Sequence, residues 1–200
     1  MDARTQKSEL TRAAIVGAAL DLALHDGLEA ITLQAVADRI GLSKSGVFSR
    51  VGSREALQKA VIEEYGHRFL ADVFVPAMQS PRGLPRLDGI MQRWIARMRD
   101  VELQTGCLYT AGAFELDDRE GELRELLLQE VTRWRAALRR TVLQAVEEGH
   151  LRADTDAGQL VSELNGLVMT LMHDGRFLRD AQAPAHALAT WQRLRAGYVA

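Results

Sequence analysis

The stretch LQAVADRIGLSKSGVFSRVG, residues 33–52, decides the fold, because its small and apolar residues have the spacing of a helix-turn-helix. Ala37 stands at the fifth place of the stretch, Gly41 at the ninth and Val47 at the fifteenth. Ala37 lets two helices cross at close range, and Gly41 can take the positive φ that ends the first helix. Ser43 can then cap the second helix, while Val47 points into the small core. An ordinary pair of packed helices is the alternative interpretation.

The outer face of the second helix is polar and basic. Five side chains between residues 39 and 59 are basic and one is acidic, a net charge of +4, whereas the whole chain of 200 residues carries −2. A basic segment on a neutral or acidic body concentrates the attraction for phosphates where docking needs it. In a helix-turn-helix, the outer face of the second helix enters the major groove of DNA. The sequence therefore predicts a DNA-binding surface at this helix.

The run GLSKSGVFSRVGSREAL, residues 41–57, closely resembles the signature of the TetR family of transcriptional repressors. On the N-terminal side the family pattern continues at Gly27, Leu28, Thr32, Val36 and Ala37. The resemblance is strongest over residues 8–65. Further along, it looks most like the branch with Gly106-Cys107 followed by Phe114-Glu115. It implies an all-α protein with a three-helix N-terminal DNA-binding domain and a C-terminal domain for ligand binding and dimerisation.

The resemblance also implies which residues contact DNA. Hydroxyls and N–H groups at helix N-termini suit a phosphate, and an arginine can hold guanine O6 and N7 or grip a phosphate. Phe48 replaces the usual Tyr and lacks its hydroxyl, while Arg50 stands where the family often has His. These departures affect the operator sequence and leave the binding mode intact; a solvated or capping role is the alternative for each residue. The expected DNA-binding residues are Thr32, Ser43, Lys44, Ser45, Gly46, Phe48, Ser49, Arg50 and Arg54.

Hydrophobic periodicity along the chain predicts about nine helices and favours an all-α class. The expected helices cover residues 8–25, 32–41, 44–50, 53–75, 87–104, 107–116, 120–148, 156–179 and 185–198. Three of the four prolines, at positions 76, 81 and 85, cluster with Gly83 and predict a domain boundary. We therefore expect a DNA-binding domain at residues 1–52, a connecting helix at 53–75, and a ligand-binding and dimerisation domain at 76–200.

The expected helix at residues 156–179 is apolar almost all round between Leu160 and Met172, which is typical of a helix buried on every side. A helix near the end of a chain achieves this most easily against a second copy. The resemblance implies that the last two helices pair with their symmetry mates in a four-helix bundle. The expected interface residues are Gly158, Ser162, Gly166, Leu188, Trp191 and Leu194. The alternative is a central helix in a monomeric core.

The segment after Val75 is rich in methionines and aromatic residues, which can line an adaptable apolar cavity. The resemblance places an inducer pocket among the helices after residue 84. Candidate residues are Met91, Trp94, Met98, Cys107, Tyr109, Phe114, Trp134, Asn165, Met169 and His173. Such residues also fit an ordinary helical core, and Asn165 and His173 equally fit a subunit interface. Cys107 fits a plain buried thiol as well as a redox or electrophile sensor.

Other function classes lack their sequence signatures. The five histidines have no metal-ligand spacing, and no GxSxG, P-loop or GxGxxG motif occurs. The acidic run at residues 115–120 lacks the spacing of a calcium loop and predicts a solvated turn that caps a helix. No run of about 18 apolar residues and no signal peptide occurs, and the single cysteine fits a reducing cytoplasm. We expect no metal, no cofactor, no membrane contact and no enzymatic activity.

Together these features predict a homodimeric TetR-like regulator, by family analogy a repressor, that binds a palindromic operator and is released by a small-molecule inducer. The ligand must bind the DNA-incompetent state more tightly for release to follow. Two alternatives remain open: a helical module that binds a protein partner without DNA, and a helical small-molecule enzyme.

Overall fold

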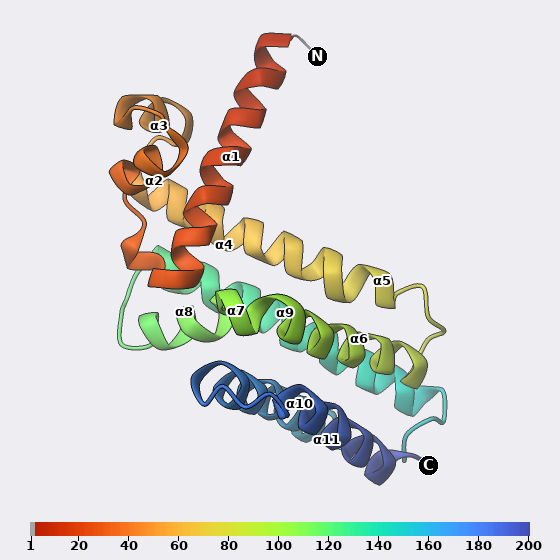
Figure 1. The fold of residues 1–200 in the computed structure, drawn as a ribbon. Helices are drawn as coiled ribbons and strands as arrows, with labels where there is room; N and C mark the ends of the chain where they lie inside the picture. Colours follow the sequence, from red (N-terminus) through yellow and green to blue (C-terminus); the bar gives the residue numbers. More distant parts are fainter. Residues whose placement is uncertain (1–2) are drawn as a thin grey trace. The chain divides into compact units, whose positions relative to one another are not determined.

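The computed structural model describes residues 3–200, with side chains from residue 5, and these residues are helical along most of their length (Figure 1). They form nine continuous helical stretches and one short 3₁₀ turn, which confirms the predicted all-α class. In this described part, a lone antiparallel bridge between Leu151 and Val199 is the one strand-like pairing. Within the same residues, no helix is both long and apolar enough to cross a lipid bilayer.

The chain divides into two compact units. The first combines the residues up to Arg68 with Cys107–Gln129, and the second combines Phe69–Gly106 with Glu130–Ala200. The elements of the first unit are α1 (Ala3–Asp26), the 3₁₀ turn η1 (Leu28–Ala30), α2 (Leu33–Ile40), α3 (Lys44–Val51), most of α4 (Arg54–Phe69), α8 (Leu108–Leu116) and the start of α9 (Glu122–Glu147).

The helix-turn-helix forms in α2 and α3 as its capping residues predict. Thr32 Oγ1 accepts the N–H of Ala35 at 3.0 Å and begins α2, and Ser43 Oγ accepts the N–H of Gly46 at 3.1 Å and begins α3. Between them Gly41 has a φ of 67°, which a residue with a Cβ rarely adopts, and α2 ends there. The fully buried residues of the pair are Val36, Ala37 and Val47.

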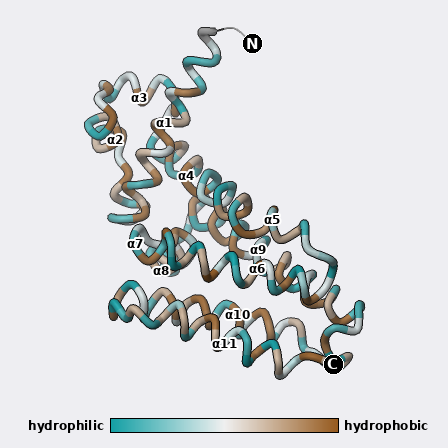
Figure 2. The backbone as a smooth tube through the Cα atoms, turned by 45° about the vertical axis from the view of Figure 1, so that its right-hand side comes forward, coloured by the Kyte–Doolittle hydropathy of each residue, from teal (hydrophilic) through white to brown (hydrophobic). Residues whose placement is uncertain are grey.

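The second unit contains the helices that follow residue 69. Its elements are the π-helical turn η2 (Leu70–Phe74), α5 (Val75–Ala77), α6 (Leu84–Arg97), the π-helical turn η3 (Met98–Glu102), α7 (Leu103–Thr105), the rest of α9, α10 (Ala157–Met172), the π-helical turn η4 (His173–Phe177) and α11 (Ala183–Tyr198). Figure 2 shows apolar residues recurring along these helices with polar residues between them. That periodicity gives each helix one face to bury.

Two of these helices begin earlier than their sequence pattern predicts. We expected starts at residues 87 and 185, whereas α6 begins at Leu84 and α11 at Ala183. Each begins just before a proline, Pro85 or Pro184. A proline in the first turn of a helix costs no hydrogen bond, because the N–H groups there have no partner within the helix. The two prolines therefore lie inside the first turns of these helices, not before them.

Within the second unit, two side chains of α11 bond to one carboxylate on α6. Trp191 is 2% exposed, and its indole N–H donates to Asp88 Oδ1 at 2.9 Å. Arg195 pairs with the other oxygen of the same carboxylate. α10 lies beside α11 in both views (Figures 1 and 2), and seven of its residues are buried.

Candidate nucleic-acid interface

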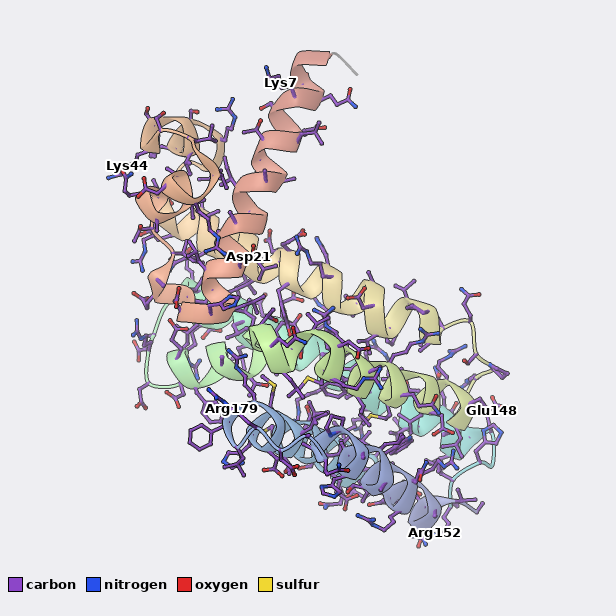
Figure 3. The ribbon with its side chains drawn as sticks, in the orientation of Figure 1. Lys7, Asp21, Lys44, Glu148, Arg152 and Arg179 are labelled. Atoms are coloured by element: carbon purple, nitrogen blue, oxygen red, sulfur yellow. The ribbon has the colours of Figure 1, made fainter. Side chains whose placement is uncertain are left out.

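The outer face of α3 presents a continuous row of exposed side chains. Its exposed residues are Lys44, Ser45, Phe48, Ser49 and Arg50. Phe48 is 56% exposed although it is a large apolar residue, while Val47 on the opposite face is fully buried. Lys44 extends away from the helix ribbon (Figure 3). α3 is thus anchored by one face and leaves the other face, with its cations, open to a groove.

The N-termini of α2 and α3 carry hydroxyls already engaged in capping. Thr32 and Ser43 each accept an N–H from their own helix, and Ser43 Oγ lies 3.1 Å from Ser45 Oγ. A hydroxyl that accepts one hydrogen bond can still donate its own proton to a phosphate oxygen. Gly46 contributes its backbone N–H to the Ser43 cap, and a Cβ there would lie 3.1 Å from Ser43 Oγ. A larger residue at this position would therefore press on the cap.

Arg50 contacts only its own helix in the interactions seen. One guanidinium nitrogen donates to the Gly46 carbonyl at 3.1 Å and to Ser49 Oγ at 3.3 Å. Both acceptors are exposed and lie within four residues. Exposed hydrogen bonds of this kind exchange readily with water. The Arg50 side chain can therefore leave this arrangement for a base edge or a phosphate at little cost.

Arg54, in contrast, is tied to the loop that precedes α2. Its Nε donates to the Ile31 carbonyl at 2.7 Å, and a terminal nitrogen donates to the Glu29 carbonyl at 2.7 Å and to the Glu29 carboxylate at 3.0 Å. The hydrogen bond from Arg54 holds the pKa of Glu29 below its ordinary value, and the positive charge of Arg119 adds to this. The expected DNA clamp is thus engaged within the protein, where it fixes the entry to α2.

Four of the expected ligand-binding residues lie buried in the second unit. Trp94 on α6 and Trp134 on α9 make an edge-to-face contact with ring centroids 5.1 Å apart. Met91 and Met98, one turn away from Trp94 on either side, are fully buried. Sequence reasoning missed two further members of this aromatic cluster, Phe69 and Phe74, whose rings lie 4.8 Å and 6.2 Å from Trp134.

The indole N–H groups of Trp94 and Trp134 have no acceptor among the described residues. The two side chains are only 6% and 4% exposed. A buried donor without a partner costs about 1–3 kcal/mol relative to its hydrogen-bonded state. The cluster therefore holds two spare donors inside an apolar aromatic surrounding.

The other expected ligand-binding residues do not join this cluster. Cys107 and Tyr109 belong to the first unit, where the Tyr65 hydroxyl donates to Cys107 Sγ at 3.1 Å and the two tyrosine rings lie 4.9 Å apart. Phe114 on α8 is 64% exposed. Asn165 donates to the carbonyl one turn before it on α10, at 2.7 Å.

Met169 lies instead on an exposed face of α10, and His173 lies at the start of η4, directly after α10. Met169 is 46% exposed, and His173 hydrogen-bonds the neighbouring Asp174 side chain at 2.9 Å. Three expected interface residues, Gly158, Ser162 and Gly166, are exposed at helical spacing on the same face. The buried apolar residues of α10 lie on its other side, so a single chain leaves this face exposed.

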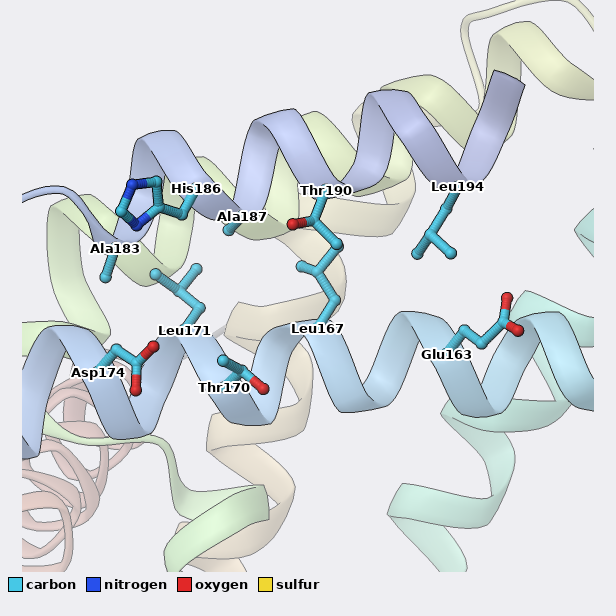
Figure 4. A pocket seen from close by; sticks show the side chains of 10 residues that line it. All are labelled: Glu163, Leu167, Thr170, Leu171, Asp174, Ala183, His186, Ala187, Thr190 and Leu194. Atoms are coloured by element: carbon cyan, nitrogen blue, oxygen red, sulfur yellow. The ribbon is translucent and has the colours of Figure 1, made fainter. Parts of the chain in front are cut away.

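A groove of about 310 Å³ separates parts of α10 and α11 (Figure 4). Its apolar lining includes Leu167, Leu171 and Leu194, and its polar rim includes Glu163 and His186. Leu194 lines this groove, and Leu188 is 39% exposed on α11. Trp191 differs from these expected interface residues, because its side chain packs inside one chain against Asp88.

Two family models match the chain. Residues 83–191 match the model described as "Tetracyclin repressor-like, C-terminal domain". Residues 15–61 match the model described as "Bacterial regulatory proteins, tetR family". The first match alone spans more than half of the chain, and the second contains the helix-turn-helix.

Individual relatives agree with these matches. An HTH-type transcriptional regulator, SrpR of Pseudomonas putida, is 22% identical over 197 residues, covering 94% of this chain and 87% of that protein. The crystal structure of a TetR-family regulator from Cytophaga hutchinsonii has a TM-score of 0.81 at 18% identity and covers 96% of each chain. AibR, crystallised with isovaleryl coenzyme A and operator DNA, has a TM-score of 0.66 at 20% identity, covering 80% of this chain and 85% of its own. At such identities the structural likeness establishes the fold.

Proposed function

The chain belongs to the TetR family of bacterial regulatory proteins, and from this premise we propose that it is a repressor that binds a palindromic operator as a homodimer and leaves it when a small molecule binds. As a transcriptional regulator it acts by binding and not by catalysis. Its site of action is the cytoplasm, where a bacterial chromosome lies. The observation that carries this proposal is the exposed, capped and basic outer face of α3.

The expected DNA-binding residues divide by their chemistry into three proposed roles. Thr32, Ser43 and Lys44 suit phosphates, because they offer hydroxyl, N–H and ammonium donors at helix N-termini. The base-facing set is Ser45, Gly46, Phe48, Ser49 and Arg50. Arg54 contributes by holding the loop before Thr32, since its guanidinium is already engaged there.

DNA selection tests this proposal directly. Fragments retained by the purified protein from random DNA should contain two inverted half-sites, with centres about 34–36 Å or a multiple of that distance apart. Their affinity should fall steeply as salt rises, because phosphate contacts release counterions. Recovery of no enriched sequence, or of binding that ignores salt, would instead favour a module that recognises a protein partner.

A second copy of the chain is the proposed cover for the exposed face of α10 and its groove against α11. Gly158, Ser162 and Gly166 let a helix approach closely, and a Cβ at Gly166 would meet nothing within 4 Å in one chain. Met169 adds apolar surface to the same face. A two-fold interface of this kind places the same patch on both copies.

The aromatic cluster of Phe69, Phe74, Trp94 and Trp134 is the proposed region for the small-molecule ligand. Its two spare indole donors suit a ligand that carries hydrogen-bond acceptors on a flat, apolar body. Met91 on α6 and Met98 at the start of η3 supply flexible side chains that can adapt to the shape of a ligand.

Substitution of each tryptophan by phenylalanine tests whether these donors are spare. All three changes remove the same atoms, which include the indole N–H donor. At Trp94 and Trp134 this donor is unpaired, whereas at Trp191 it is bonded to Asp88. We expect Trp191→Phe to lower the free energy of unfolding by about 1–3 kcal/mol more than either of the others. Chemical denaturation measures the difference. Equal losses at all three sites would show that the two donors do find acceptors in the folded protein.

We propose the functional division that the sequence suggests: DNA binding at residues 1–52, a connecting helix at 53–75, and ligand binding and dimerisation at 76–200. Compactness groups the chain differently, because Cys107–Gln129 cluster with the helix-turn-helix although they lie within the C-terminal family match. By sequence, this segment belongs to the C-terminal family match, and by packing it belongs to the first unit, which contains the helix-turn-helix.

A further inference from the structure

The carboxylate of Glu115, near the end of α8, holds the turn that leads into the helix-turn-helix. Its Oε2 accepts the N–H of Leu28 at 2.9 Å, and its Oε1 accepts the N–H of Glu29 at 2.8 Å. These are the first two N–H groups of η1, and no residue of that turn can satisfy them. Glu115 therefore caps a helical turn 86 and 87 residues away in the sequence.

Gly27 is what permits this approach. Its φ is 90°, and a Cβ at this position would lie 3.0–3.2 Å from the carboxyl atoms of Glu115. Any other residue would both strain the backbone and press on the carboxylate. We call Glu115, together with residues 27–29 that it holds, the Glu115 clasp.

The other side of the same loop is held by α4. Gln58, which is buried, donates to the Leu28 carbonyl at 2.8 Å, and Arg54 donates to the Ile31 carbonyl at 2.7 Å. Glu29 pairs with Arg54 and also with Arg119, which follows α8, at 3.0 Å in both cases. The loop directly before Thr32 is thus fixed to α4 on one side and to α8 on the other.

We propose that Glu115 is a positioning residue for operator binding, which sets where the helix-turn-helix lies on α8. This inference rests on the proposed DNA-binding function and adds a residue to it that does not touch DNA. In a dimer on a palindrome, the second reading helix binds as an intramolecular step whose strength depends on how closely the spacing of the two heads is held. A helix-turn-helix that is held less firmly still reads one half-site, but the two copies in the dimer no longer match the spacing of the operator.

The test compares a full operator with a single half-site, both taken from DNA selected by the wild-type protein. Glu115→Ala should lower the affinity for the full operator by about tenfold, while its affinity for a duplex with one half-site scrambled stays within about twofold of wild type. Glu120→Ala is the matched control, because it removes an exposed carboxylate five residues away and changes the net charge equally. Hydrogen exchange should accelerate at the amides of Leu28 and Glu29 in Glu115→Ala alone.

Gly27→Ala should reproduce the loss on the full operator, and its effect should shrink in the Glu115→Ala background, since the two changes act on one contact. Equal losses on full and half-sites would show that Glu115 merely keeps the head folded and would overturn the proposal, as would unchanged affinity for both. Failure of the wild-type protein to select any DNA would count against the proposed function itself.

Discussion

Arg50→Ala is expected to lower operator affinity by about 1–3 kcal/mol for each half-site, and so by about 2–6 kcal/mol for a dimer that engages two. The reason is that Arg50 lies on the exposed face of α3, and the hydrogen bonds of its side chain among the described residues go to its own helix. Its removal leaves the core of the head untouched. Fluorescence anisotropy with the selected operator at physiological salt measures the loss.

The kind of loss separates Arg50 from its neighbours. If Arg50 reads a base, Arg50→Ala also relaxes the preference at one base pair of each half-site, which a repeated DNA selection reveals. Lys44→Ala is the matched comparison, because Lys44 is exposed on the same helix and a phosphate contact weakens all sequences alike. It should reduce the salt slope by about 1 per half-site. Normal operator affinity in Arg50→Ala, with dimer and helicity intact, would refute the assigned contact.

The helix-turn-helix could be predicted because every feature that makes it is local. Thr32 and Ser43 cap within three residues, and Gly41 turns the chain by its own conformation. The Glu115 clasp could not be predicted in this way. The acidic run at residues 115–120 predicts a solvated turn that caps a helix, but Glu115 lies within α8 and is half-buried. It caps η1 through Leu28 and Glu29, which are far away in the sequence. No periodicity connects such positions.

The aromatic cluster shows a similar limit. Trp94 and Trp134 stand out by composition, yet their contact depends on how α6 packs with α9. Phe69 continues the four-residue apolar spacing of α4, and Phe74 lies in the π-helical turn η2, but neither position indicates by itself that the ring meets Trp134. The burial of Trp191 has the same origin, since its partner Asp88 lies on another helix.

The helix α10 illustrates the opposite case, because its sequence predicts more burial than a single chain provides. The pattern predicted a helix buried on every side, and within one chain the face with Gly166 and Met169 stays exposed. A second copy over this face would reconcile the two. The expected burial of this helix on every side is therefore itself an argument for the proposed dimer.

Gly166→Arg is expected to convert the proposed dimer to monomers and to abolish measurable binding to the full operator. Within one chain the new side chain meets open space, because a Cβ at this position has nothing within 4 Å. The change also favours the helix by about 1 kcal/mol, since glycine is a poor helix former. At a two-fold interface, however, each arginine would add volume and charge where its own copy adds the same. Sedimentation velocity measures the assembly state.

Ala136→Arg provides the control for this experiment, because Ala136 is exposed on α9 and the substitution adds the same charge. It should leave both the dimer and the operator affinity unchanged within about twofold. Circular dichroism of Gly166→Arg should show full helicity, so a loss of operator binding would follow from separation of the two heads and not from unfolding. A Gly166→Arg protein that still sediments as a dimer would place the interface elsewhere, and the exposed face of α10 would then need another partner.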